Sequence, residues 1–251
     1  MTLTPLRPIA EPEYPDSDGK PMAESDPARD SLTYAVEALK LYFAARPDVY
    51  VSGNLFIFYA RGFADAVVSP DVFVVFGVEK RDRPSYKLWE ENGITPDLVI
   101  EITSKSTRHT DSVDKPDKYI KLGVTEYFQY DPTGDYLDPP LLGFRLVDGK
   151  YEPMTSGGTG DGMIVIRSAV LGLELRLEGG RLRFFDPETS KYLLSYQEEH
   201  AGRLRAEAER QEAVEERYKT AERLLAMAMS VEQVAALTNL DADDLRRRFG
   251  G

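Results

Sequence analysis

The sequence contains no cysteine. It can therefore form neither a disulfide framework nor a thiolate metal site, and this composition suits the reducing cytoplasm. The longest apolar runs, such as "VFVVF" at 72–76, are too short to span a bilayer. No signal-peptide core is found in the first residues, "MTLTPLRPIAEPEYPDSDG". We therefore expect a cytoplasmic protein with no membrane segment.

Positive charge is also scarce, since 31 Lys and Arg stand against 43 Asp and Glu, giving a formal net charge of −12. This balance argues against a protein that coats nucleic acid through overall positive charge. It does not argue against an enzyme that contacts nucleic acid at one site. Seven acidic side chains lie within residues 11–30, against Lys20 and Arg29. The charge of any site must therefore be judged locally.

The chain changes character along its length. Residues 1–27 are rich in Pro, Asp and Glu with almost no periodicity, which predicts a disordered or loosely draped arm. The stretch "SLTYAVEALKLYFAAR" then predicts a helix capped by Asp30 or Ser31. Three β-like segments follow, "VYVSGNLFIFYA", "DAVVSPDVFVVFGV" and "PDLVIEIT", with "VEKRDRPSYKLWEENG" as a polar loop before the third.

A helix in "PDKYIKLG" and a strand in "TEYFQYD" continue this pattern. The order helix, three strands, helix, strand predicts an α/β domain over residues 28–188, with a sheet buried between helices. Hairpin turns at Asp148-Gly149 and Gly179-Gly180 indicate further strands that extend or flank that sheet.

Residues 189–229 are rich in Ala, Glu, Arg and Leu and predict a long helix. A seven-residue seam of Leu204, Tyr218 and Leu225 is interrupted by Gln211. This pattern leaves open a dimerising coiled coil and a helix packed on its own domain.

The tail, residues 230–251, predicts two short helices. A capping box of Ser230 and Gln233 would open the first helix, and Asp241 would cap the second. Both a DNA-reading helix-turn-helix and a helical dimerisation or docking tail fit this pattern, and the docking tail is the simpler interpretation.

Glu101 lies inside the apolar strand "PDLVIEIT". Burying a carboxylate is costly unless something pairs with it. The partner could be a cation shared with a second carboxylate, or a buried Lys or Arg in a structural ion pair. Asp97 lies on the same strand face but about 13 Å away, whereas Mg²⁺ ligands lie about 2.1 Å from the ion. We therefore expect Asp97 to hydrogen-bond at the strand entrance instead.

Asp71 opens the preceding apolar strand, "DVFVV", and is the better partner for Glu101. Adjacent strands lie about 4.8 Å apart, so the two carboxylates can converge on one hard cation. The backbone carbonyl of Ile102 and water would complete its coordination shell.

An anionic substrate also needs a basic group, and the candidates near this strand are Lys105, Lys115, Lys118 and Lys121. Pro116 suits the first turn of a helix, which places Lys115 at the helix N-terminus. Phosphate binds readily at such a helix end, so Lys115 is the preferred candidate.

The segment "TPDLVIEITSKSTRHTDSVDKPDKYIKLGVTEYFQYDP" resembles the Uma2 family of restriction-endonuclease-like proteins. The family pattern is "PDLVVEVLSPST", then Asp-x-x-x-Lys-x-x-x-Tyr, then "GVxEYWLVDP". Asp97, Glu101, Asp111, Lys115 and Tyr119 fall on matching positions. Upstream, "SPDVFVV" resembles the family's "QPDLLFV", which assigns Asp71. The resemblance covers roughly residues 31–225.

This resemblance implies the PD-(D/E)XK nuclease fold: a restriction-endonuclease-like mixed β-sheet core flanked by helices, here with a C-terminal long helix or coiled coil. It implies an endonuclease dependent on Mg²⁺, or on Mn²⁺, with Asp71 and Glu101 as metal ligands. The superfamily's lysine normally sits two residues after the glutamate, where this chain has Thr103. Lys115 is then the implied replacement, with Lys105 and Lys118 as the other candidates.

Two secondary roles belong to this metal-dependent mechanism. Glu37 would add an outer-sphere metal ligand, with an ordinary surface glutamate as the simpler alternative, and Asp111 would hold the loop before Lys115.

DNA would be the substrate, and a homodimer would supply two sites for two strands. The alternative is a nuclease-fold protein without useful activity that acts as an interaction module through its C-terminal helices. Tyr119, Tyr127 and Tyr130 are interpreted as core residues with hydrogen-bonded hydroxyls.

Overall fold

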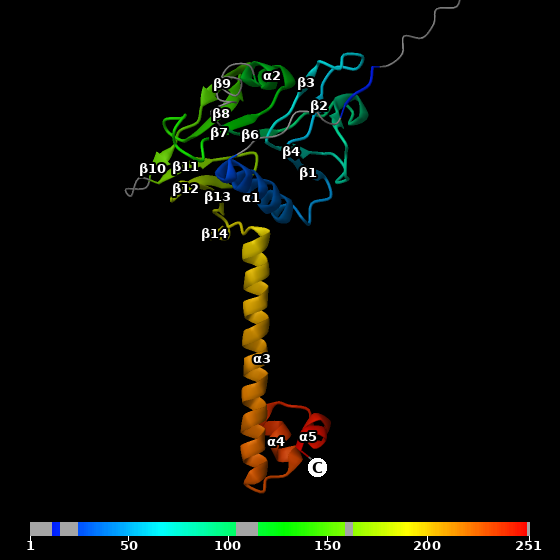
Figure 1. Ribbon diagram of the computed structural model, residues 1–251, viewed down its shortest axis with the longest axis vertical. Coiled ribbons are helices and arrows are strands. Elements are labelled where there is room, and N and C mark those ends of the chain that lie inside the picture. Colours follow the sequence, from blue (N-terminus) through cyan, green and yellow to red (C-terminus); the bar gives the residue numbers. More distant parts are fainter. Residues whose placement is uncertain (1–11, 16–24, 104–114, 159–162, 250–251) are drawn as a thin grey trace, which may run out of the picture. The chain divides into compact units, whose positions relative to one another are not determined.

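The computed structural model describes residues 12–15, 25–103, 115–158 and 163–249. These residues fall into two units, Met1–Ser195 and Tyr196–Gly251, which are considered separately (Figure 1). The first unit is a mixed α/β structure, and its core follows the predicted order of helix, three strands, helix and strand.

The main sheet has six strands in the order β1-β4-β6-β7-β8-β9. Strands β1, β4 and β6 are antiparallel neighbours, whereas β7 runs parallel to β6 because helix α2 connects the two. The bounds are β1 (Val49–Ser52), β4 (Val72–Phe76), β6 (Leu98–Ile102), α2 (Lys115–Leu122), β7 (Glu126–Tyr130), β8 (Leu141–Val147) and β9 (Lys150–Pro153).

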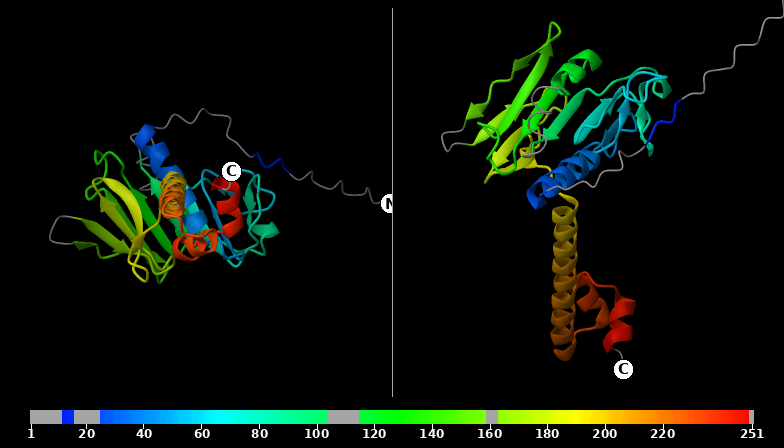
Figure 2. Two further views of the ribbon diagram at one scale, coloured as in Figure 1. Left: turned by 90° about the horizontal axis from the view of Figure 1, so that it is seen from below. Right: turned by 45° about the horizontal axis from the view of Figure 1, so that its top comes forward.

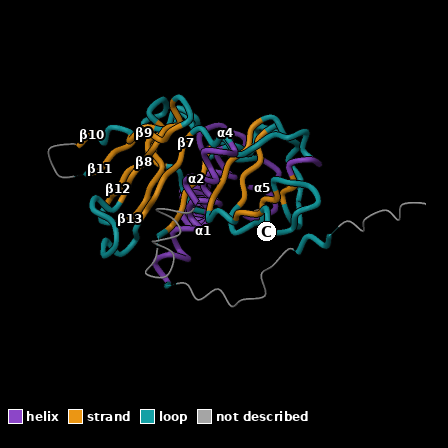
Figure 3. Tube along the Cα trace, turned by 90° about the horizontal axis from the view of Figure 1, so that it is seen from above, coloured by secondary structure: helices purple, strands orange, loops and turns teal. Residues whose placement is uncertain are grey.

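The central strands are continuous apolar runs because both faces of the sheet are covered. Successive side chains of β6 alternate between the faces. Leu98, Ile100 and Ile102 join the core beneath helix α1, whereas Val99 joins the core beneath Tyr119 of α2. Figure 3 shows both helices in purple among the strands. Glu101 therefore points to the α2 side.

Helix α1 (Asp26–Tyr42) begins earlier than the sequence predicted. Ser25 is its N-cap and accepts a hydrogen bond from the backbone N–H of Ala28 at 3.4 Å. Pro27 lies in the first turn, where its fixed φ is compatible with a helix. The predicted caps, Asp30 and Ser31, therefore lie within the helix.

A second sheet of five strands packs on the α1 side of the main sheet (Figure 2). The hydroxyl of Tyr34 on α1 accepts from the N–H of Phe184 and donates to the carbonyl of Leu193, both at 3.1 Å. Of the predicted later strands, β8 and β9 thus extend the main sheet and the rest flank it. The flanking strands are β10 (Gly157–Gly158), β11 (Ile164–Arg167), β12 (Glu174–Glu178), β13 (Arg181–Asp186) and β14 (Lys191–Tyr192).

A small third sheet has the order β3-β2-β5 and packs on the α2 side. Its strands are β2 (Ile57–Phe58), β3 (Val67–Val68) and β5 (Tyr86–Lys87), and a 3₁₀ helix, η1 (Leu88–Glu90), follows. The segment predicted as a polar loop therefore contains a strand and a helical turn.

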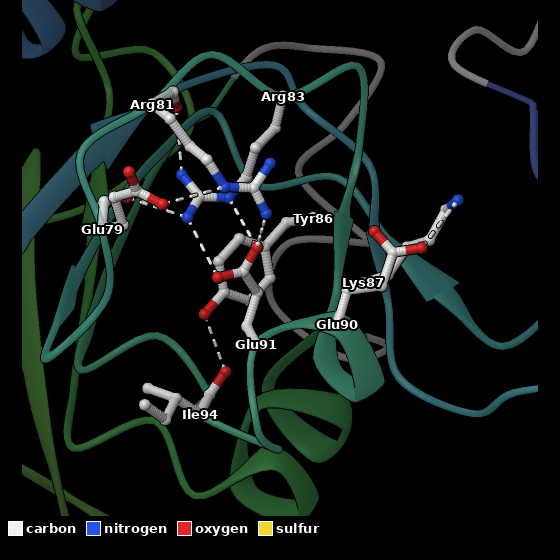
Figure 4. Close-up of polar contacts among 8 residues, drawn as sticks. All are labelled: Glu79, Arg81, Arg83, Tyr86, Lys87, Glu90, Glu91 and Ile94. Atoms are coloured by element: carbon white, nitrogen blue, oxygen red, sulfur yellow. Dashed lines mark hydrogen bonds and ion pairs between the residues drawn. The ribbon is translucent and has the colours of Figure 1, made fainter.

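A buried ion pair holds this segment in place. Arg83 donates from Nε and Nη2 to the two carboxylate oxygens of Glu91, at 2.8 and 3.0 Å, and stacks 4.2 Å from the ring centre of Tyr50. Arg81 reaches the same carboxylate at 2.6 Å. Figure 4 shows both guanidinium groups converging on Glu91, while Lys87 and Glu90 point to another side of the segment. A polar sequence is thus ordered by charge pairing.

Part of the predicted N-terminal arm is packed against the first unit. The ring of Tyr14 lies 5.1 Å from the Phe58 ring and 5.0 Å from the Trp89 ring, measured between centroids. Its hydroxyl accepts from the N–H of Gly62 at 2.5 Å. The four described arm residues, 12–15, are therefore ordered by aromatic contacts.

The second unit consists of α3 (Tyr196–Ala226), α4 (Val231–Thr238) and α5 (Ala242–Phe249). Helix α3 begins seven residues later than predicted because the chain up to Tyr192 forms the β13–β14 hairpin. The predicted capping box of Ser230 and Gln233 is confirmed. Asp241 accepts from two backbone N–H groups at the start of α5, as predicted. No helix among the described residues has the length and apolar character needed to cross a membrane.

Candidate active site

Two side chains of α2 bind the buried carboxylate of Glu101. The Nζ of Lys115 lies 2.7 Å from Oε2, and the hydroxyl of Tyr119 donates to Oε1. Glu101 is completely buried, whereas the Lys115 side chain is 18% exposed. Because Lys115 and Tyr119 are four residues apart on a helix, they project from one face and reach the same carboxylate. The charge in the apolar strand is thus compensated from α2.

Asp71 lies beside this group. The register of β4 and β6 pairs Val72 with Ile100, and one further step places Asp71 opposite Glu101 on the same face of the sheet. The Oδ2 of Asp71 accepts the backbone N–H of Ile102 at 2.6 Å, which holds the side chain against β6. Burial raises the pKa of Tyr119 well above its ordinary value, and the negative charges of Glu101 and Asp71 raise it further. Both carboxylates therefore raise the pKa of the same tyrosine hydroxyl.

Thr103 directly follows β6. Its side chain is buried, and its Oγ has no hydrogen-bond partner among the described residues. A buried hydroxyl without a partner is costly. On the neighbouring strand, Gln129 is paired with Glu101 in register and donates to the hydroxyl of Tyr127 at 3.0 Å. Thr103 Oγ is thus a polar atom with capacity left for a water molecule or a phosphate oxygen.

The other candidate residues lie elsewhere or outside the described chain. Asp97 accepts from the N–H of Phe76 at 2.8 Å, which confirms its expected role at the strand entrance; burial raises its pKa. Glu37 stands on α1, on the opposite side of the main sheet. Lys118 points to the carbonyl of Val67 at 3.5 Å. Lys105 and Asp111 lie outside the described residues.

The donor set is compatible with a hard divalent cation. Among the residues described by the structure, no group of three or more acidic or histidine side chains could hold a metal. Mg²⁺ does not need such a group, because it is commonly bound by one or two carboxylates together with water and substrate phosphate. Asp71 and Glu101 present carboxylate oxygens on one face of the sheet, and the buried Thr103 hydroxyl directly follows β6.

The sequence interpretation missed the contact of Tyr119 with Glu101. Tyr119 was expected only to be a core residue with a hydrogen-bonded hydroxyl, and it is indeed fully buried. The signal that could have found its partner was the spacing of four residues from Lys115, which places both side chains on one face of α2.

Comparisons with known proteins identify the family of the chain. No curated protein matches the chain. The crystal structure of a "putative nuclease belonging to DUF820" from Anabaena variabilis is similar, with 16% identity, a TM-score of 0.39, and coverage of 58% of this chain and 80% of that chain. The sequence pattern of the Uma2 family, described as "Putative restriction endonuclease", matches residues 10–178. Because this match spans more than half of the sequence, the chain belongs to the Uma2 family of restriction-endonuclease-like proteins.

Proposed function

We propose that this protein is a Mg²⁺-dependent endonuclease that hydrolyses phosphodiester bonds of DNA. One observation carries the proposal: Asp71 and Glu101 face each other across two strands, at the point where α2 presents Lys115. A divalent cation held by carboxylates can polarise a phosphate and activate water, and an ammonium group beside it can stabilise the charge that develops. Family membership supports a nuclease at the coarser level.

Asp71 and Glu101 would hold the metal, with the backbone carbonyl of Ile102 as a further ligand. A divalent cation at this place would polarise the scissile phosphate and lower the pKa of a bound water. Mn²⁺, which also prefers oxygen ligands, would serve in place of Mg²⁺.

Lys115 would act on the substrate. Its ammonium group lies at the first residue of α2, in the part of the site that is reached by solvent. There it can bind a phosphate oxygen, orient the attacking water and stabilise the charge that develops on phosphorus. The 2.7 Å ion pair with Glu101 supports Lys115 as the replacement for the lysine that is missing at Thr103.

Tyr119 would position Glu101. Its hydroxyl stays protonated at neutral pH because burial and the neighbouring carboxylates raise its pKa. A protonated hydroxyl donates to one oxygen of Glu101 and leaves the other oxygen facing Lys115. Thr103 would offer its hydroxyl to a water molecule or to the phosphate.

The test is Mg²⁺ binding by calorimetry and plasmid nicking, measured on the same samples. We expect Asp71→Asn and Glu101→Gln to lose both binding and nicking. Lys115→Met should bind Mg²⁺ and lose nicking, while Lys121→Met, which removes an exposed lysine from the same helix, should keep both. Wild-type protein that binds no Mg²⁺ even with DNA present would refute the proposal.

The second unit supports a separate candidate role as an interaction module. Helix α3 exposes Leu204 by 54% and Val214 by 40% of their surface, and residues 200–217 are exposed throughout. A second copy that packs along this helix would bury both side chains and give the homodimer that cuts two strands. Light scattering should then give a dimer mass for the wild type and a monomer mass for Leu204→Glu, with Arg205→Glu as an exposed control. A monomeric wild type would refute this role.

A further inference from the structure

A hollow in the first unit combines aromatic and basic side chains. Its volume is about 490 Å³, within the range of about 300–1,000 Å³ typical of small-molecule sites. It lies on the three-stranded sheet and η1, and its lining residues are Pro12, Tyr14, Arg61, Lys87, Trp89 and Glu90. None of these residues is part of the candidate active site, which consists of Asp71, Glu101, Thr103, Lys115 and Tyr119.

The hollow lies on the side of the main sheet that carries Glu101. Strands β2, β3 and β5 pack through Ile57, Val68 and Tyr86 into the same core as Tyr119. Lys118 of α2 points to the carbonyl of Val67 on β3 at 3.5 Å, which joins α2 directly to the small sheet. The hollow and the Glu101 site therefore both belong to the part of the first unit on the α2 side of the main sheet.

The chemistry of the hollow fits one nucleotide. Trp89, the single tryptophan of the chain, is half-buried, so that part of its ring is open to solvent. The Tyr14 ring packs beside it at 5.0 Å, and the ammonium group of Lys87 lies 5.3 Å from the centre of the Tyr14 ring. Aromatic rings stack on nucleobases, and neighbouring cations bind the phosphates.

Two basic side chains line the hollow. Among its described lining residues, Arg61 and Lys87 are basic and Glu90 is acidic. Lys87 is paired with Glu90 at 3.3 Å, and both side chains are partly exposed. Such exposed pairs contribute about 0–1 kcal/mol, so a phosphate can compete for Lys87.

We propose that this hollow binds an unpaired nucleotide of the substrate, with the base stacked on Trp89 and the phosphate held by Lys87 and Arg61. Bases inside a duplex are already stacked on their neighbours, so only an unpaired base can offer its face to Trp89. This inference rests on the proposed nuclease function. It narrows the substrate to nucleic acid that contains a single-stranded or displaced segment.

The experiment measures binding without cleavage, in EDTA, with a short oligothymidylate and a blunt duplex of equal length. The oligothymidylate should quench the fluorescence of Trp89, and the duplex should leave it unchanged. A labelled oligothymidylate followed by anisotropy should bind Trp89→Leu about 5- to 150-fold more weakly than wild type. Trp89→Tyr should restore most of the affinity.

Matched variants separate the hollow from general charge and from folding. The logarithm of the binding constant falls linearly with the logarithm of salt concentration. Lys87→Gln should make this slope shallower by about 0.7, the value for one phosphate on a single strand. Lys150→Gln, which removes an exposed lysine on β9, should leave this slope unchanged, and Tyr196→Leu should leave affinity unchanged.

The outcomes for the hollow and for the nuclease are distinguishable. Glu101→Gln should bind the oligothymidylate in EDTA as tightly as wild type. Wild-type protein that binds the oligothymidylate but does not nick plasmid in Mg²⁺ would retain the hollow and refute only the nuclease. If plasmid nicking persists and Trp89→Leu binds the oligothymidylate as tightly as wild type, the proposed nucleotide binding in the hollow is refuted. Equal quenching by the duplex, or by a polyglutamate peptide, would also refute it.

Discussion

Replacing Lys115 by Met distinguishes a metal site from a structural ion pair. The substitution removes the ammonium group that lies 2.7 Å from Glu101 and keeps a side chain of similar length. Glu101, which is completely buried, then retains the hydroxyl of Tyr119 as its described side-chain donor. We therefore expect a substantial loss of stability when no divalent cation is present.

The magnitude follows from the burial of the pair. Removing one partner of a buried ion pair costs about 3–5 kcal/mol because the other charge is left uncompensated. The lower end applies here, since the Lys115 side chain is 18% exposed and water can reach the carboxylate once the ammonium group is gone. About 3 kcal/mol corresponds to a fall of about 6–12 °C in the melting temperature for a unit of this size.

The assay is urea unfolding followed by intrinsic fluorescence. The single tryptophan, Trp89, belongs to the first unit, so its signal reports the unfolding of that unit alone. Lys121→Met is the matched control because it removes an exposed lysine from the same helix, and it should change the free energy of unfolding by less than about 1 kcal/mol.

Mg²⁺ provides the decisive comparison. A cation that binds only the folded state stabilises it by about 2.7 kcal/mol at a free concentration of about 100 times its Kd. If Asp71 and Glu101 hold Mg²⁺, the cation should restore most of the stability that Lys115→Met loses in EDTA. Equal stability of variant and wild type in EDTA would refute the energetic argument. A destabilised variant that Mg²⁺ does not rescue would refute the metal site.

Three further predictions concern the first unit. Glu91→Gln should destabilise it by about 3 kcal/mol in urea, because Arg83 loses its buried counter-charge; an unchanged midpoint would contradict this. Burial would raise the pKa of Asp131, but four hydrogen bonds from the following turn lower it below its ordinary value. Wild type should therefore lose stability as the pH falls below about 4, and Asp131→Asn should lose less stability in the same acid titration. Tyr119→Phe should cost about 1.5–3 kcal/mol, measured by urea unfolding, because Glu101 loses a charge-assisted hydrogen bond. Wild type should also lose stability above about pH 10. There Tyr119 ionises in the unfolded chain, whereas in the folded protein burial, and next the charge of Glu101, raise its pKa and keep it protonated. Tyr119→Phe should lose less stability in this pH range.

Much of the site could be predicted because its signals are local. Glu101 interrupts an apolar run, so its need for a partner is visible in the sequence. Pro116 indicates the start of a helix, and α2 indeed begins at Lys115. The N-terminal caps of the two short C-terminal helices were predictable for the same reason, because a capping contact joins residues two or three apart.

Other features depend on long-range contacts and were missed. The polar segment with Arg83 and Glu91 was predicted as a loop, because the buried ion pair that orders it and the Tyr50 ring beneath Arg83 are not apparent from local periodicity. The start of α1 was misplaced because several residues near it can serve as N-caps, and only the fold selects Ser25. The five-stranded sheet could not be separated from the main sheet because short strands do not indicate which neighbours they pair with.

The sequence by itself determined the α/β core, the buried carboxylate and the helical spacing of Lys115 and Tyr119, because these follow from apolar patterning and helix period. Only the tertiary structure decided that Asp71 stands opposite Glu101, since a shift of one residue in the β4–β6 register would turn the side chains to the other face. Only the tertiary structure brought Tyr14, Arg61 and Trp89 around one hollow. These residues are far apart in the chain, and their proximity results from strand pairing and aromatic packing.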